Sequence, residues 1–272
     1  MQPEEVLRGK VCLITGASRA LGAEIARTLA RCGAKIAVNY RQSADAAHAL
    51  CAELSARGGT AIPLQADVSL PEDVSRLVAT TWETLGPIDV LVNNAGPYGE
   101  TPFLDLSVAD FDQIMAANVR ATFLVTQAAG RHMKARGQGY VINIAATDIF
   151  HRSHSVYGLA KSGVVYLTEA LARELAPEVR VNAIAPDLIA DNEGMDAVFV
   201  RQVVTATPLG RLVTRAEIAE MVCLLCTPAF DIVTGHTIVM DGGRSIPRIA
   251  MGPETGRVEA ETDSAAPTGP EK

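Results

Sequence analysis

The stretch VCLITGASRALG, residues 11–22, decides the fold because a short apolar run leads through a glycine-containing turn into a helical pattern. Val11–Ile14 has the composition of a buried strand, and Leu21–Cys32 has the apolar spacing of an amphipathic helix. Gly16 permits the tight turn, and Gly22 lets the helix approach the strand closely. The N–H groups that open the helix then form a binding site for a pyrophosphate. The alternative is an ordinary βα loop that contains glycine and binds nothing.

Beyond this unit, short apolar runs alternate with longer helical patterns up to about residue 245. The alternation predicts an α/β fold, a single-domain Rossmann-like doubly wound parallel sheet of about seven strands with helices on both faces. We expect this domain in residues 1–251 and a disordered tail in residues 252–272, which lack apolar periodicity. The expected strands are Val11–Ile14, Lys35–Tyr40, Ala61–Gln65, Val90–Asn93, Tyr140–Ile144, Arg180–Ile184 and Thr237–Met240. The expected helices are Leu21–Cys32, Ala44–Arg57, Pro71–Leu85, Phe111–Arg136 and Val156–Leu175.

The composition of the chain excludes several classes of partner. Its 272 residues carry a net charge of −7, and the basic residues are scattered, which argues against nucleic acid or an anionic membrane as the main partner. The acidic N-terminus does not resemble a signal peptide, and no apolar run reaches the ~18 residues of a membrane span, so we expect a soluble cytoplasmic protein. The five cysteines are expected to be reduced. Cys223 and Cys226 are expected to pack as small apolar residues rather than to bind a metal.

Four motifs follow one another along the chain: Thr15-Gly16-x-x-x-Ala20-x-Gly22, Asn93-Asn94-Ala95-Gly96, Asn118 in the expected long helix, and Tyr157-x-x-x-Lys161. In this order and combination the chain resembles the short-chain dehydrogenase/reductase family over about residues 9–245. Ala20 replaces a glycine of the family motif, as a side chain does in the similar pteridine reductase branch. The resemblance implies a homotetramer, an adenine held between Asp67 and Val68, and a nicotinamide-side ribose held by the Asn-Asn-Ala-Gly turn.

The end of the second expected strand bears on the choice of dinucleotide. NAD-binding Rossmann sites place an acidic residue there to bind the ribose 2′-hydroxyl, but residues 38–43, VNYRQS, contain no carboxylate. Arg41 and Arg19, with the Ser43 hydroxyl, are suited to neutralise a 2′-phosphate instead, so we expect NADPH rather than NADH. The full set of expected cofactor contacts is Gly16, Ser18, Arg19, Leu21, Asn39, Tyr40, Arg41, Ser43, Asp67, Val68, Asn94, Ala95, Gly96, Tyr157, Lys161, Pro186 and Leu188.

The spacing of Tyr157 and Lys161 points to proton transfer. Residues four apart lie on one face of a helix, so the ammonium can lie near the phenol. A neighbouring cation favours the phenolate, and we expect it to bring the tyrosine pKa down from ~10 toward the working range. Tyr157 can then exchange a proton with the substrate as hydride moves. The resemblance adds that Lys161 binds the nicotinamide ribose and that Asn118 positions a water in the proton relay.

One residue of the family pattern is missing. The serine that hydrogen-bonds the substrate oxygen is replaced by Ala146, and loss of such a donor typically costs ~10²–10³ in rate. Asp148 and Thr147 are the nearest substitutes, and a carboxyl can donate if burial raises its pKa. We expect Asp148 to be catalytic, the alternative being a surface-loop aspartate. The Thr-Asp pair and the ending DGGR, residues 241–244, resemble bacterial dihydromonapterin reductases.

The segment after the sixth expected strand also departs from the family. Pro186 is followed by Asp187 where the family has a glycine, and Asp191 stands where it has the threonine that contacts the carboxamide. Backbone groups near Leu188 are expected to make that contact.

These features favour an NADPH-dependent oxidoreductase that transfers hydride to a pterin-like C=N bond or to a carbonyl of a small molecule. One alternative is a 3-oxoacyl or other ketone reductase of the same family, which the general motif set favours and the missing serine disfavours. Another is a nucleotide-binding sensor or scaffold with little catalysis, which the changes at Ala20, Ala146 and Asp191 favour. An intact set of Tyr157, Lys161 and Asn118 argues against that reading.

Overall fold

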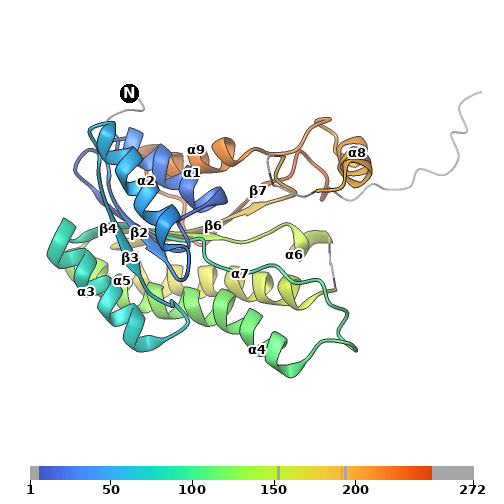
Figure 1. The fold of residues 1–272 in the computed structure, drawn as a ribbon, viewed down its shortest axis with the longest axis horizontal. Coiled ribbons are helices and arrows are strands. Elements are labelled where there is room, and N and C mark those ends of the chain that lie inside the picture. The colour runs from blue at the N-terminus through green and yellow to red at the C-terminus, as the bar shows by residue number, and fades with distance from the viewer. Residues whose placement is uncertain (1–5, 152–153, 191, 193–194, 247–272) are drawn as a thin grey trace, which may run out of the picture.

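The computed structural model describes residues 6–151, 154–190, 192 and 195–246. Within them a seven-stranded parallel sheet has the strand order β3-β2-β1-β4-β5-β6-β7 (Figure 1). The strands are β1 (Val11–Ile14), β2 (Lys35–Tyr40), β3 (Thr60–Gln65), β4 (Ile88–Asn93), β5 (Gly139–Ile144), β6 (Val179–Pro186) and β7 (Thr237–Met240). The predicted doubly wound, Rossmann-like sheet is therefore confirmed.

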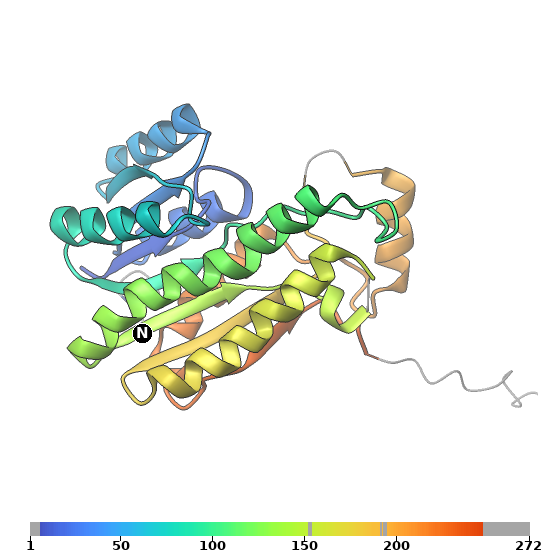
Figure 2. The same ribbon diagram turned by 90° about the horizontal axis from the view of Figure 1, so that it is seen from below.

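Helices cover both faces of this sheet. One face is covered by α1, α2 and α9 and the other by α3, α5 and α7, as the two views show (Figures 1 and 2). The helical segments are α1 (Ala20–Arg31), α2 (Ala44–Ala56), α3 (Pro71–Leu85), α4 (Val108–Met115), η2 (Ala116–Arg120), α5 (Ala121–Arg136), α6 (Asp148–His151), α7 (Val156–Leu175), α8 (Ala197–Ala206), α9 (Arg215–Leu225) and η3 (Pro228–Phe230).

The expected elements fall within two residues of the observed ones, with one exception. The helix expected over Phe111–Arg136 begins at Val108 and is interrupted by the π-helical turn η2, so it is not one regular helix. Helix α7 has the predicted bounds, and its start is fixed by Ser155, whose hydroxyl accepts a hydrogen bond from Gly158 N.

Two apolar layers hold the helices to the sheet. Ile14, Ile36 and Val92 belong to the cluster that packs under α1, α2 and α9, while Leu13 and Leu91 belong to the cluster that packs under α3, α5 and α7. Successive strand residues point to opposite faces, so strands buried on both sides read as continuous apolar runs. For this reason the strands can be predicted from the sequence.

The order of the strands reverses between β1 and β4. In open α/β sheets, ligands bind outside the carboxyl ends of the strands at such a switch point. The turn after β1 and the turn after β4 lie side by side there, since Asn94 N donates to Oγ1 of Thr15 at 3.0 Å. The functional site is therefore expected at the carboxyl ends of β1 and β4.

All five cysteines are free and buried, and Cys223 and Cys226 lie on α9. Sγ of Cys32 lies 3.0 Å from Sγ of Cys223. In the part of the chain that the structure describes, no three His, Cys, Asp or Glu side chains are arranged to hold a metal ion. The helices of that part are all too short or too polar to cross a membrane.

Candidate functional site

The turn after β1 is held by the turn after β4. Nδ2 of Asn94 donates to the carbonyl oxygens of Thr15 and Gly16, at 3.0 and 3.1 Å. In return, Oγ1 of Thr15 accepts hydrogen bonds from Asn94 N and Ala95 N, both at 3.0 Å. Gly16 has φ +61°, the left-handed conformation that glycine adopts without strain. The two motifs therefore form one rigid unit.

A cleft of about 390 Å³ opens at this unit. The predicted cofactor contacts that line it are Gly16, Ser18, Arg19, Leu21, Asn39, Tyr40, Arg41, Ser43, Asp67, Val68, Asn94, Ala95 and Gly96. Tyr157, Lys161, Pro186 and Leu188 do not line this part of the cleft. Asn39 is fully buried and orders the end of β2, because its amide donates to Ala66 O at 3.1 Å and its Oδ1 accepts from Gly16 N at 3.2 Å.

Two glycines that line this cleft leave no room for a side chain. A β-carbon on Gly22 would clash with the carbonyl oxygen of Gly16, and one on Gly96 would clash with Oδ1 of Asn118. Ala20 has φ +50°, a left-handed conformation that costs a residue with a β-carbon about 1–2 kcal/mol. This strain is the structural consequence of the missing glycine of the motif.

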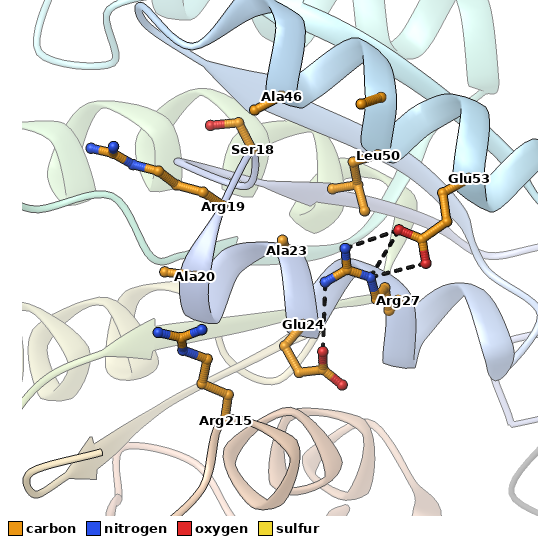
Figure 3. A pocket seen from close by; sticks show the side chains of 11 residues that line it. Ser18, Arg19, Ala20, Ala23, Glu24, Arg27, Ala46, Leu50, Glu53 and Arg215 are labelled. Carbon is orange, nitrogen blue, oxygen red and sulfur yellow. Dashed lines mark hydrogen bonds and ion pairs between the residues drawn. The ribbon is translucent and has the colours of Figure 1, made fainter. Parts of the chain in front are cut away.

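The two arginines expected at a 2′-phosphate differ in their surroundings. Nη1 of Arg41 lies 3.6 Å from Oδ2 of Asp67, so its charge is partly matched within the protein. Arg19 lies at the rim that the cleft shares with a second pocket between α1 and α2 (Figure 3), and it has no ion-pair partner among the described residues. Deeper in that pocket Arg27 is paired with Glu53 at 2.9 Å (Figure 3). Both arginines line the cleft, and among the described residues the charge of Arg19 is the less matched of the two.

Tyr157 and Lys161 lie together on α7, as their spacing predicts. The Lys161 ammonium is 5.4 Å from the centre of the Tyr157 ring, and it donates to Ile144 O at 2.8 Å. Lys161 is 3% exposed, so the ammonium is removed from water and held by the backbone of β5. The Tyr157 phenol, which can donate a proton, and the Lys161 ammonium cation therefore lie side by side.

The pKa values of the pair differ from the sequence-based expectation. Burial, and then the negative charge of Asp148, raise the pKa of Tyr157 well above its usual range. Burial lowers the pKa of Lys161 to about 8, although the charge of Asp148 opposes the shift. This direction is opposite to the one expected from the neighbouring Lys161, and burial is the largest cause of the shift. The phenol therefore keeps its proton at neutral pH.

Asn118 lies in the π-helical turn η2 and is fully buried. Its Nδ2 donates to Ile114 O at 3.0 Å and to Pro97 O at 3.2 Å, while its Oδ1 has no hydrogen-bond partner among the described residues. An unpaired buried acceptor next to Gly96 is suited to a bound water. This fits the role in a proton relay that the family resemblance implies.

In the segment after β5, the two candidate substitutes for the missing serine, Thr147 and Asp148, have different surroundings. Ala146 is 6% exposed and offers no hydroxyl, and Thr147 is 2% exposed and donates its hydroxyl to Oδ1 of Asp187 at 2.9 Å. Asp148 opens α6, and its charge affects both Tyr157 and Lys161. Asp148 is therefore better placed than Thr147 to act beside the phenol. Asp191 lies outside the described residues.

Two features near the site were not predicted from the sequence. The ring of Tyr98 meets the Tyr157 ring edge to face, with centres 4.9 Å apart, and Tyr98 is 59% exposed. Its position two residues after the Asn-Asn-Ala-Gly turn was the available signal. The second feature is an ion pair between Asp187 and Arg244, 57 residues apart, for which the local sequence gives no signal.

Comparison with known proteins agrees with this geometry. The family model described as enoyl-(acyl carrier protein) reductase matches residues 16–245. A 3-oxoacyl-[acyl-carrier-protein] reductase of Synechocystis is 39% identical over 243 residues, which are 87% of this chain and 97% of that protein. A reductase of the same name from Staphylococcus aureus is 32% identical over 239 residues, 86% of this chain and 97% of that protein.

Among solved structures, a short-chain dehydrogenase/reductase from Serratia marcescens superposes with a TM-score of 0.83 at 34% identity. The match covers 89% of this chain and all of that one. None of these three proteins is named a pteridine reductase, so the branch predicted from the sequence stays a prediction.

Proposed function

The chain belongs to the short-chain dehydrogenase/reductase family, and on that premise we propose that it is an NADPH-dependent reductase of a pterin-like C=N bond. NADPH, when bound in the cleft, supplies the hydride. Residues Gly16 to Gly96 of the cleft would hold its adenosine and pyrophosphate, and Arg19 its 2′-phosphate. The homotetramer and the cytoplasmic location remain predictions.

The observation that carries the proposal is the pairing of Tyr157 with Lys161, whose ammonium lies 5.4 Å from the centre of the phenol ring. Because burial and Asp148 raise its pKa, Tyr157 holds its proton at neutral pH. A group that must donate a proton as hydride arrives is then already in its acidic form. Lys161, held by Ile144 O, keeps a positive charge beside the phenol below about pH 8. Tyr157 and Lys161 together can therefore supply the proton that accompanies hydride transfer to the substrate.

The substrate class follows from the residues after β5. Ala146 cannot donate a hydrogen bond to a carbonyl oxygen, and the hydroxyl of Thr147 is directed to Asp187. The carboxylate of Asp148 can instead accept hydrogen bonds from the ring N–H groups of a pterin. We therefore assign Asp148 the contact with the substrate.

Reduction of a 3-oxoacyl thioester is the second candidate. The names of the relatives from Synechocystis and Staphylococcus aureus favour it, as do Tyr157, Lys161 and Asn118. The absence of a hydroxyl at Ala146 disfavours it.

The deciding experiment measures NADPH consumption with a dihydropterin and with an acetoacetyl thioester. We expect higher kcat/KM with the dihydropterin, and we expect Asp148→Ala to lower it by ~10²–10³. Asp112→Ala, which removes an exposed carboxylate from α4, is the matched control and should leave the rate unchanged.

Faster turnover of the thioester, with no response to Asp148→Ala, would replace the pterin assignment by the second candidate. Binding of NADPH without turnover of either substrate, and indifference to Tyr157→Phe, would instead indicate a sensor or scaffold.

A further inference from the structure

Asp187 is a buried carboxylate that accepts hydrogen bonds from the side chains of Arg244 and Thr147. Its side chain is 7% exposed. Arg244 donates to both carboxylate oxygens, with Nη2 2.6 Å from Oδ1, and Thr147 donates its hydroxyl to Oδ1 at 2.9 Å. Burial alone would raise the pKa of Asp187, but the hydrogen bonds from Arg244 and Thr147 hold it below the usual range. The carboxylate therefore stays charged and keeps both partners.

Backbone hydrogen bonds bring the same three segments together. Thr147 N donates to Pro186 O at 3.1 Å, and Asp187 N donates to Met240 O at 3.1 Å. The carboxyl ends of β5, β6 and β7 are thus joined at one point by Asp187. Thr147 is fixed through both its backbone and its side chain.

Asp148 follows Thr147 directly, so its direction depends on how Thr147 is held. Its charge reaches Tyr157 and Lys161 on one side, and it contributes to the raised pKa of Arg244 on the other. The carboxylate is therefore close enough to Tyr157, Lys161 and Arg244 for its charge to act on all three.

We propose that Asp187, Thr147 and Arg244 form a positioning unit that holds Asp148 beside Tyr157. The unit takes over the task of orienting the substrate side of the site, which lacks the family's serine. The inference rests on the proposed function for its effect on rate, but the geometry that it claims can be measured without a substrate.

The fold contains a matched control at the opposite edge of the sheet. Asp89, at the amino end of β4, pairs with Arg136 at 2.7 Å and accepts a hydrogen bond from Val11 N at 3.0 Å. It is another partly buried Asp–Arg pair that joins strands, far from the proposed site. Variants of Asp89 and Arg136 therefore show how the loss of a buried ion pair affects the stability of the fold without affecting the proposed site.

The first experiment uses hydrogen–deuterium exchange of the amides in residues 145–151 in the intact protein. Thr147→Val preserves the shape of the side chain and removes the hydroxyl, and Asp187→Asn and Arg244→Lys weaken the ion pair. We expect each to speed exchange in this segment by roughly three- to tenfold, the equivalent of one net hydrogen bond. Thr147→Ser should restore the slow exchange, and Asp89→Asn and Arg136→Lys should leave the segment unchanged.

The second experiment is a double-mutant cycle on the substrate that the NADPH assay identifies. Thr147→Val should lower kcat by roughly three- to tenfold without changing KM for NADPH. In an Asp148→Asn background it should have no further effect, because both changes act through one carboxylate. Melting temperatures of all variants separate this effect from loss of fold.

Unchanged exchange in Thr147→Val and Asp187→Asn would overturn the inference, whether or not a substrate is known. So would additive effects of Thr147→Val and Asp148→Asn on kcat. If exchange responds as expected but Asp148→Asn alone leaves turnover unchanged, the positioning unit stands and the role proposed for Asp148 fails.

Discussion

The two halves of the site are built in different ways. In the dinucleotide half, short motifs hold one another through local turns, as Asn94 holds Thr15 and Gly16. In the substrate half, residues far apart in the chain do this work, as Arg244 and Thr147 meet at Asp187. The first half follows the family pattern with one strained exception at Ala20, and the second half departs from it at Ala146 and Asp187.

The difference teaches where specificity resides. A turn that binds a phosphate through backbone N–H groups needs glycines at fixed places, and few side chains can replace them. A hydrogen bond to a substrate can come from any suitable group that reaches the same point, so the substrate half can change while the chemistry of Tyr157 is retained. The predictions below test this division.

Loss of the Tyr157 hydroxyl should have the largest effect. General acid catalysis contributes ~10²–10⁴ in rate, so Tyr157→Phe should lower kcat by about that factor while NADPH binding is kept. Tyr166→Phe, which removes an exposed hydroxyl from the same helix α7, is the control and should match the wild type. Steady-state kinetics and calorimetric NADPH titration measure the two effects. Equal rates for Tyr157→Phe and Tyr166→Phe would contradict the assignment of Tyr157 as the proton donor.

Much of the fold could be predicted because its signals are local. Strand Val11–Ile14 and helices Pro71–Leu85 and Val156–Leu175 have the predicted bounds, since apolar runs, Pro71 in the first turn and the Ser155 cap all lie within a few residues of them. The π-helical turn at Ala116–Arg120 was missed, because such turns are rare and the segments on both sides of it have the pattern of an α-helix.

The candidate site divides in the same way. The residues from Gly16 to Gly96 were found by motif, and they share one cleft. The pairing of Asp187 with Arg244 and the raised pKa of Tyr157 depend on packing between distant segments, which no local pattern encodes. The sequence favours Asp148 over Thr147 without a geometric reason, and the structure adds that the Thr147 hydroxyl donates to Asp187.

Loss of the Arg19 charge should have the next largest effect. Because Arg19 has no ion-pair partner among the described residues, Arg19→Ala should raise KM for NADPH by ~10-fold or more and leave KM for NADH unchanged, the loss expected for one hydrogen bond to a charged group. Arg31→Ala, at the far end of α1, removes the same charge away from the cleft. A tenfold preference of the wild type for NADH would contradict the cofactor assignment.

The pH dependence of reduction should report Lys161. With a pKa of about 8, Lys161 is charged below that pH and neutral above it, so kcat/KM for reduction should be halved near pH 8 and fall about tenfold per unit beyond. Tyr157 adds no step there, because its pKa is raised. A profile measured from about pH 6 to pH 9.5 checks this. A flat profile through pH 9 would show that the lysine charge is not needed.

Relief of the strain at Ala20 should have the smallest effect and a distinctive sign. Ala20→Gly removes the β-carbon from a residue at φ +50°, so it should stabilise the fold by about 0.5–1 kcal/mol after the entropic cost of glycine is subtracted. Ala49→Gly, at an exposed position inside α2, should destabilise it by about 1 kcal/mol. Urea denaturation measures both. Ala20 lines the dinucleotide cleft. A gain in stability with unchanged NADPH affinity would show that replacing the motif glycine by Ala20 costs this half of the site only backbone strain. A loss of stability would mean that the methyl group of Ala20 makes favourable contacts.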